Sequence, residues 1–90
     1  MSGATATPRL KPGVRLRFDR AGDAWALVAP ERVFQLDPVA AEVMRRVDGV
    51  HSLETIVEEL ARSFAAPRAT IAADVGEMLR DLALKGAIDL

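Results

Sequence analysis

The fold is decided within the stretch Arg32-Val33-Phe34-Gln35-Leu36-Asp37-Pro38-Val39-Ala40, where the hydrophobic pattern changes its period. Residues 32–36 are rich in strand formers and predict a strand. Asp37 is a favoured N-cap, and Pro38 suits the first helical position because its missing N–H costs nothing there. We therefore expect a helix that ends near a C′ residue at Gly49 and whose apolar side chains recur at helical spacing: Val39, Ala40, Val43, Met44 and Val47.

Two further strands are predicted on the N-terminal side of this stretch. Residues 14–19 alternate apolar and polar side chains, the period of a half-buried strand, which turns Arg15 and Arg17 toward water. Residues 25–28 form a short apolar run after a turn at 20–23. Three strands with short connections favour an antiparallel meander.

Two further helices are predicted on the C-terminal side. Ser52 can cap the first of them, and Pro67 opens the second. The apolar stripe of the first is Leu53, Ile56, Val57, Leu60 and Phe64. That of the second is Ile71, Val75, Met78, Leu79 and Leu82. Lys85-Gly86 ends the last helix, and residues 87–90 are long enough for a short closing strand.

The predicted fold is α+β, with a three-stranded antiparallel sheet followed by three helices and a short C-terminal strand. This order is winged helix-turn-helix-like in layout. A length of 90 residues predicts one domain, over residues 9–90, preceded by a flexible tail of small residues at 1–8.

Composition and charge exclude several classes of protein. The chain contains no Cys, which excludes disulfides, thiolate metal sites and Cys nucleophiles. Residues 1–36 carry six basic and three acidic side chains, a net of +3, whereas residues 37–90 carry six and ten, a net of −4. Because a polyanion requires a concentrated basic face, the acidic helical part argues against nucleic acid as a partner. No apolar run could span a membrane and no secretory signal is present, so we expect a cytoplasmic protein.

Catalytic motifs are scarce in this sequence. His51 is the only His, and its neighbour Ser52 is expected to cap a helix, so a loop His without a catalytic role is favoured over a hydrolase centred on His51. Carboxylates at helical spacing, such as Glu54 and Glu58, are interleaved with basic side chains and indicate a solvated face. No clustered metal ligands and no Gly-rich phosphate loop occur, so no metal or cofactor is expected.

Two features could carry a binding function. If the sheet order follows the sequence, residues 32–36 form an edge strand, whose main chain can pair with an extended peptide. An ordinary, protected edge strand explains the same pattern equally well. The third helix has more apolar residues than one narrow stripe requires, and part of it could floor a groove beside this edge, although core packing accounts for most of them.

Four segments carry a family resemblance through their order and spacing. They are residues 8–16 (PRLKPGVRL), residues 28–37 (VAPERVFQLD), Val47-Asp48-Gly49 before residues 53–57 (LETIV), and Ala66-Pro67-Arg68 before residues 71–75 (IAADV) with residues 82–86 (LALKG) closing the series. Together they resemble the PqqD family, the peptide chaperones of pyrroloquinoline quinone (PQQ) biosynthesis, over residues 8–90.

The resemblance implies a non-catalytic adaptor without a cofactor of its own. Members of this family look like a stand-alone recognition element for a ribosomally made precursor peptide. The resemblance implies that the domain binds the peptide PqqA as an added strand on its third strand, against its third helix. It further implies presentation of PqqA to PqqE, a radical S-adenosylmethionine (SAM) enzyme that cross-links a Glu and a Tyr of the peptide.

The resemblance also implies which residues bind the peptide. On the strand they are Arg32, Val33, Phe34, Gln35 and Leu36. On the third helix they are Asp74, Val75, Met78, Leu79 and Leu82. The oligomeric state, monomer or dimer, is left open by the sequence. The alternative function is that of a winged-helix DNA-binding regulator, which the layout suits and the acidic helical region does not.

Overall fold

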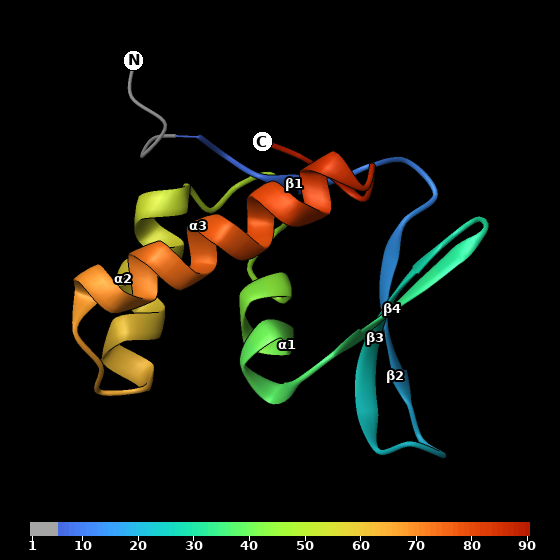
Figure 1. The fold of residues 1–90 in the computed structure, drawn as a ribbon, viewed down its shortest axis with the longest axis horizontal. Coiled ribbons are helices and arrows are strands. Elements are labelled where there is room, and N and C mark those ends of the chain that lie inside the picture. Colours follow the sequence, from blue (N-terminus) through green and yellow to red (C-terminus); the bar gives the residue numbers. More distant parts are fainter. Residues whose placement is uncertain (1–5) are drawn as a thin grey trace.

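A computed structural model describes residues 6–90 and confirms the predicted α+β class. Figure 1 shows the helices on one side of the molecule and the three-stranded sheet on the other, with α1 directly following β4. In chain order the elements are β1 (Arg9–Leu10), β2 (Arg15–Asp19), β3 (Ala24–Ala29), β4 (Arg32–Leu36), α1 (Pro38–Met44), α2 (Leu53–Ser63), α3 (Arg68–Leu84) and β5 (Ile88–Asp89).

The strands β2, β3 and β4 form the predicted antiparallel meander, in that order across the sheet. Their register aligns apolar side chains in two rows on the face that packs against the core. One row is Leu16, Leu27 and Phe34, and the next is Phe18, Trp25 and Leu36, of which Phe18 is exposed and lies outside the core cluster. The sheet order leaves β2 and β4 as the two edge strands.

The predicted caps start the first two helices. The side chain of Asp37 accepts a hydrogen bond from the N–H of Ala40 at 2.7 Å. The hydroxyl of Ser52 accepts one from the N–H of Thr55 at 3.1 Å. Pro67 occupies the cap position of α3, where no side chain bonds the first turn. The side chains of Asp37 and Ser52 each satisfy a donor that a helix start otherwise leaves unpaired.

Helix α1 ends sooner than its hydrophobic pattern predicts. The last helical residue is Met44. The N–H groups of Arg46 and Val47 bond carbonyls only three residues back, at 3.0 and 3.1 Å, which tightens the chain into a 3₁₀-type turn. Val47 is buried from this turn rather than from the helix. The C-cap of α1 is Arg45, so Gly49 lies too far along the chain to be the C′ residue, and its φ of +79° belongs to the loop that follows.

Helix α3 ends at Lys85-Gly86 as predicted. Gly86 has a φ of +80°, a left-handed conformation that favours glycine. Its N–H bonds the carbonyl of Ala83 at 3.1 Å, and the N–H of Ala87 bonds that of Leu82 at 2.9 Å. This pair of bonds is the Schellman motif, which turns the chain sharply toward β5.

The closing strand is present, and its partner is a strand that the sequence did not reveal. Leu10 of β1 lies opposite Ile88 of β5 in a separate two-stranded antiparallel sheet. The N–H of Lys11 extends the pairing to the carbonyl of Ala87 at 3.0 Å. A two-residue strand is too short to show a hydrophobic period, which explains why β1 was missed.

Residues 6–8, the end of the segment predicted as a flexible tail, pack against the domain. The carbonyl of Ala6 accepts a hydrogen bond from the N–H of Leu53 at 2.7 Å, and that of Pro8 accepts one from Gly49 at 3.0 Å. Pro8 is fully buried. The rest of the predicted tail, residues 1–5, lies outside the described residues.

The core draws on the sheet, the helices and the closing strand. Its largest fully buried apolar side chains are Leu27, Ile56, Leu60, Leu79, Val43 and Ile88. Together they join the sheet and the helices into one hydrophobic cluster. Within residues 6–90, no helix combines the length and the apolar character needed to cross a bilayer.

Candidate functional site

The β4 strand has one side of its main chain available for pairing. It pairs with β3 on one side, and no other described strand lies along its second side. Pro30 and Glu31 form the connection to β3. Counting the alternation of an antiparallel pair from this two-residue connection directs the N–H and C=O groups of Val33 and Gln35 away from β3. Such outward groups are what an added strand pairs with.

The side chains of β4 divide between its two faces. Val33 is 59 % exposed, and Arg32 and Gln35 are exposed as well. Phe34 is half-buried, at the border between the core and the solvent. Leu36 is only 8 % exposed and belongs to the core. Four of the five strand positions are therefore accessible to a partner, and Leu36 is not.

The predicted helix positions divide in the same way. Val75, Leu79 and Leu82 of α3 are buried in the hydrophobic cluster. Asp74 is exposed, and Met78 is half-buried on the margin of that cluster. Asp74 and Met78 are one helical turn apart, so they share one flank of the helix. This flank is the part of the predicted helix site that a ligand could contact.

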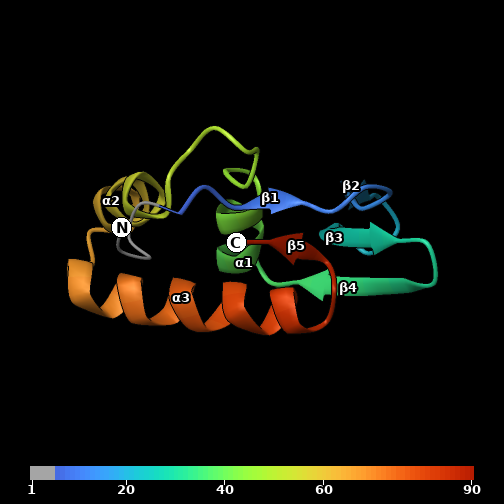
Figure 2. The same cartoon turned by 90° about the horizontal axis from the view of Figure 1, so that it is seen from above.

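Arg32 connects the start of β4 to the end of α3. Its guanidinium Nη1 donates a hydrogen bond of 3.3 Å to the main-chain carbonyl of Lys85. The same guanidinium lies 4.8 Å from the ring centroid of Phe34, a cation–π geometry. Figure 2 shows α3 and β4 along the same side of the molecule. The edge strand and the helix are thus tied together at one end.

His51 lies in the loop between α1 and α2, among carboxylates rather than beside a nucleophile. Its Nδ1 is 2.8 Å from Oδ2 of Asp48, and its Nε2 is 3.8 Å from Oε2 of Glu59. The neighbouring Ser52 hydroxyl is engaged as a helix cap. These contacts are those of a loop-stabilising His.

Asp48 organises this loop through its own hydrogen bonds. Hydrogen bonds from the main-chain N–H groups of His51, at 2.9 Å, and Val50, at 2.8 Å, stabilise the charged carboxylate. They lower the pKa of Asp48 to about 2. Asp48 is therefore an ionised structural group in the physiological pH range. Within residues 6–90, no cluster of three or more potential ligands could hold a metal ion.

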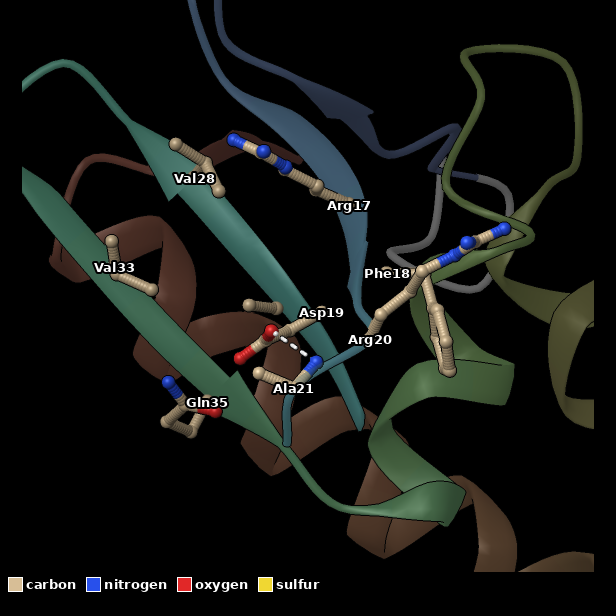
Figure 3. A pocket seen from close by; sticks show the side chains of 9 residues that line it. Arg17, Phe18, Asp19, Arg20, Ala21, Val28, Val33 and Gln35 are labelled. Atoms are coloured by element: carbon tan, nitrogen blue, oxygen red, sulfur yellow. Dashed lines mark hydrogen bonds between the residues drawn. The ribbon is translucent and has the colours of Figure 1, made fainter. Parts of the chain in front are cut away.

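A hollow of about 720 Å³ lies over the sheet face that is opposite the core. Figure 3 shows side chains of all three strands around it. The register forms two rows on this face, Arg17 beside Ala26 beside Gln35, and Arg15 beside Val28 beside Val33. The sequence predicted that Arg15 and Arg17 face water. It gave no sign of the hollow, because a hollow depends on the register between strands.

The comparisons with known proteins agree on one family. The family model described as Coenzyme PQQ synthesis protein D (PqqD) matches residues 24–88, more than half of the chain. A protein of Xanthomonas euvesicatoria named PqqA binding protein is 49 % identical over 92 residues, covering 100 % of both chains. A protein of the same name from Rhodopseudomonas palustris is 43 % identical, covering 88 % of this chain and 78 % of its own.

Two solved structures are similar to this one. The first is the solution NMR structure of the PqqD truncation of Methylobacterium extorquens PqqCD, described as a functional, stand-alone recognition element for ribosomally synthesized and post-translationally modified peptides. It matches with a TM-score of 0.80 and 38 % identity over 100 % of both chains. The crystal structure of PqqD from Xanthomonas campestris matches with a TM-score of 0.63 and 46 % identity over 90 % of both chains. Sequence, family model and fold therefore lead to the same conclusion, that this chain belongs to the PqqD family.

Proposed function

We propose that this protein is a non-catalytic adaptor that binds the precursor peptide PqqA and presents it to the radical SAM enzyme PqqE. The observation that carries the proposal is the edge strand β4, tied to α3 by Arg32, in a chain whose relatives are named PqqA binding protein. The radical chemistry belongs to the enzyme in this proposal. The lack of Cys is consistent with that division, because iron–sulfur clusters are held by Cys thiolates.

Binding occurs by strand addition in this proposal. PqqA lies as an extended strand along β4 and pairs with the outward main-chain groups of Val33 and Gln35. Side chains on one face of the peptide pack against Phe34 and the flank of α3 that carries Asp74 and Met78. Main-chain pairing provides affinity that does not depend on peptide sequence, and the half-buried Phe34 and Met78 select apolar side chains.

Presentation works through effective concentration. An adaptor that holds both the peptide and the enzyme converts their encounter into an intramolecular step. Ordering a disordered peptide offsets roughly 2–5 kcal/mol of the gross interaction energy, so moderate affinity is expected. Moderate affinity also lets the modified peptide leave.

A proline at Val33 tests the strand-addition mode. Val33→Pro removes an outward N–H and leaves the groups that pair with β3 in place, whereas the control Val33→Thr keeps the N–H and a β-branched side chain. We expect Val33→Pro to weaken PqqA binding at least about tenfold, roughly 1.4 kcal/mol, in calorimetric titration. We expect Val33→Thr to bind as the parent does. Equal affinity of both variants, with unchanged circular dichroism, would refute pairing at this strand.

A further inference from the structure

The sheet has a second face whose chemistry the peptide site does not use. We define the outer sheet face as the side chains on the side of the sheet opposite the core: Arg15, Arg17, Asp19, Ala26, Val28, Val33 and Gln35. The 720 Å³ hollow lies over this face. We propose that the outer sheet face docks onto an acidic surface patch of the peptide-modifying enzyme, an inference that rests on the proposed function.

The outer sheet face carries basic side chains that form no ion pair within the described part of the chain. Arg15 and Arg17 of β2 are exposed, and neither of them forms an ion pair with another residue in the range 6–90. Asp19, the one acidic residue among those that line the hollow, accepts a hydrogen bond of 3.0 Å from the N–H of Ala21 in the turn. The guanidinium groups of Arg15 and Arg17 are therefore free to pair with carboxylates of another molecule.

Two arginines in the helical part of the chain, in contrast, are paired with carboxylates of the same chain. Arg46 bonds Glu59 at 2.9 Å and Glu42 at 3.1 Å. Arg68 lies 3.9 Å from both Glu54 and Glu58. The acidic excess of the helices is thus partly neutralised within the chain. The basic excess of the sheet remains for an acidic partner, which associates faster because of the opposite charge.

The floor of the hollow favours a protein partner over nucleic acid. Beside the arginines of β2 lie the small or aliphatic side chains of Ala26, Val28 and Val33 on the two neighbouring strands. Arginine beside an apolar floor is typical of protein–protein interfaces. Nucleic-acid platforms instead need aromatic rings that stack on bases, and the nearby Phe18 packs edge-on against Trp25 at a centroid distance of 5.3 Å.

Continuity with the peptide edge identifies the enzyme as the partner. Val33 and Gln35 belong to the β4 edge and to the outer sheet face at once. A strand added to β4 extends the sheet, and every second side chain of that strand then projects on the outer face. An enzyme docked on this face therefore touches the adaptor and the presented peptide together.

A double charge reversal tests this surface. The variant is Arg15→Glu/Arg17→Glu, and the matched control, Arg62→Glu/Arg80→Glu, makes the same charge change on exposed helix positions. PqqE and PqqA affinities are measured separately by calorimetry, at about 50 and 200 mM salt. We expect the test variant to bind the enzyme at least about tenfold more weakly and PqqA within about twofold of the parent. We expect the control to match the parent in both affinities, and Arg15→Lys/Arg17→Lys to retain most of the enzyme affinity.

The possible failures are distinguishable. Unchanged enzyme affinity of the test variant, with normal PqqA binding, overturns this inference alone. If the parent protein itself does not bind PqqA, the proposed function is overturned. If the parent protein binds a DNA duplex in a salt-sensitive way and the test variant does not, the face belongs to nucleic acid. If the parent protein forms concentration-dependent dimers in sedimentation and the test variant does not, the face belongs to a second copy of the chain. Either of the last two results overturns the inference as well.

Discussion

The guanidinium of Arg32 donates a hydrogen bond of 3.3 Å to the main-chain carbonyl of Lys85, 53 positions away in the sequence. This contact joins the first residue of β4 to the residue that caps the end of α3. A cation beside the last carbonyls of a helix also complements the helix dipole. Arg32 therefore fixes the edge strand relative to the helix at one end of the proposed peptide site.

Removal of this contact is expected to affect binding more than folding. Arg32→Ala deletes one exposed hydrogen bond and one cation–π contact, so the free energy of unfolding is expected to fall by only about 0.5–1 kcal/mol. PqqA affinity is expected to fall about three- to tenfold, because the strand is no longer held at a fixed distance from the helix. Denaturant unfolding and calorimetry measure the two effects. A stability loss without an affinity loss would place Arg32 outside the site.

Met78 and Leu84 offer a matched pair on one helix. Met78 is half-buried on the flank shared with Asp74, whereas Leu84 is 88 % exposed and lies about 120° away around the helix. Met78→Ala is expected to weaken PqqA binding about tenfold because an apolar contact with the peptide is lost. Leu84→Ala is expected to have no effect on the same calorimetric titration. The reverse order of effects would move the groove to the other flank of α3.

Leu79 is expected to serve the fold rather than the peptide. Its side chain is 1 % exposed within the core cluster. Leu79→Ala is expected to lower the free energy of unfolding by about 2–5 kcal/mol, through lost burial and the cavity left behind. Urea unfolding monitored by circular dichroism gives this value. A loss below about 1 kcal/mol would contradict the core position of this side chain.

Gly86 isolates the cost of backbone conformation from that of steric contact. A Cβ added there meets no atom within 4 Å, but its φ is +80°. Gly86→Ala is therefore expected to destabilise the domain by roughly 1–2 kcal/mol through left-handed strain alone. Asn tolerates this conformation better than Ala, so Gly86→Asn is expected to destabilise the domain less. Thermal unfolding of the parent and of both variants measures the two effects. An alanine variant as stable as the parent would show that the Schellman turn can relax.

Asp48 makes stability depend on pH at the acidic end. Its pKa is lowered in the folded state from the ordinary 3.8 to about 2, so its contribution is full above about pH 4 and is lost as the pH falls toward 2. Asp48→Asn is expected to flatten this part of the stability–pH curve, measured by denaturant unfolding from pH 5 to pH 2. If the stability–pH curves of both proteins have the same slope, the loop hydrogen bonds do not stabilise the ionised form of the Asp48 carboxylate.

The elements that the sequence predicted have strong local signals. Asp37, Ser52 and Gly86 are caps whose chemistry is decided within a few residues, and each lies where predicted. The end of α1 was predicted too late along the sequence. Val47 stands at helical spacing from Val43, but it lies in the 3₁₀-type turn that follows the helix. Strand β1 was missed because its partner Ile88 is far away in the sequence. Short elements stabilised by distant pairing leave no periodic pattern to read.

The candidate site was predictable in outline and not in detail. The β4 edge followed from the meander order, which the sheet confirms. The helix residues were carried over from the family as one set, although Val75 and Leu82 are buried and Asp74 is exposed. Spacing identifies a helix face, but the boundary between core and groove depends on how neighbouring elements pack.

The most direct test of the central claim follows the backbone amides of isotope-labelled protein during titration with PqqA. Strand addition predicts saturable shifts concentrated in residues 31–37 and on the α3 flank around Asp74 and Met78, with slowed amide exchange at Val33 and Gln35. Shifts concentrated instead on the β2 edge, or saturating PqqA without shifts in residues 31–37, would contradict peptide binding at β4.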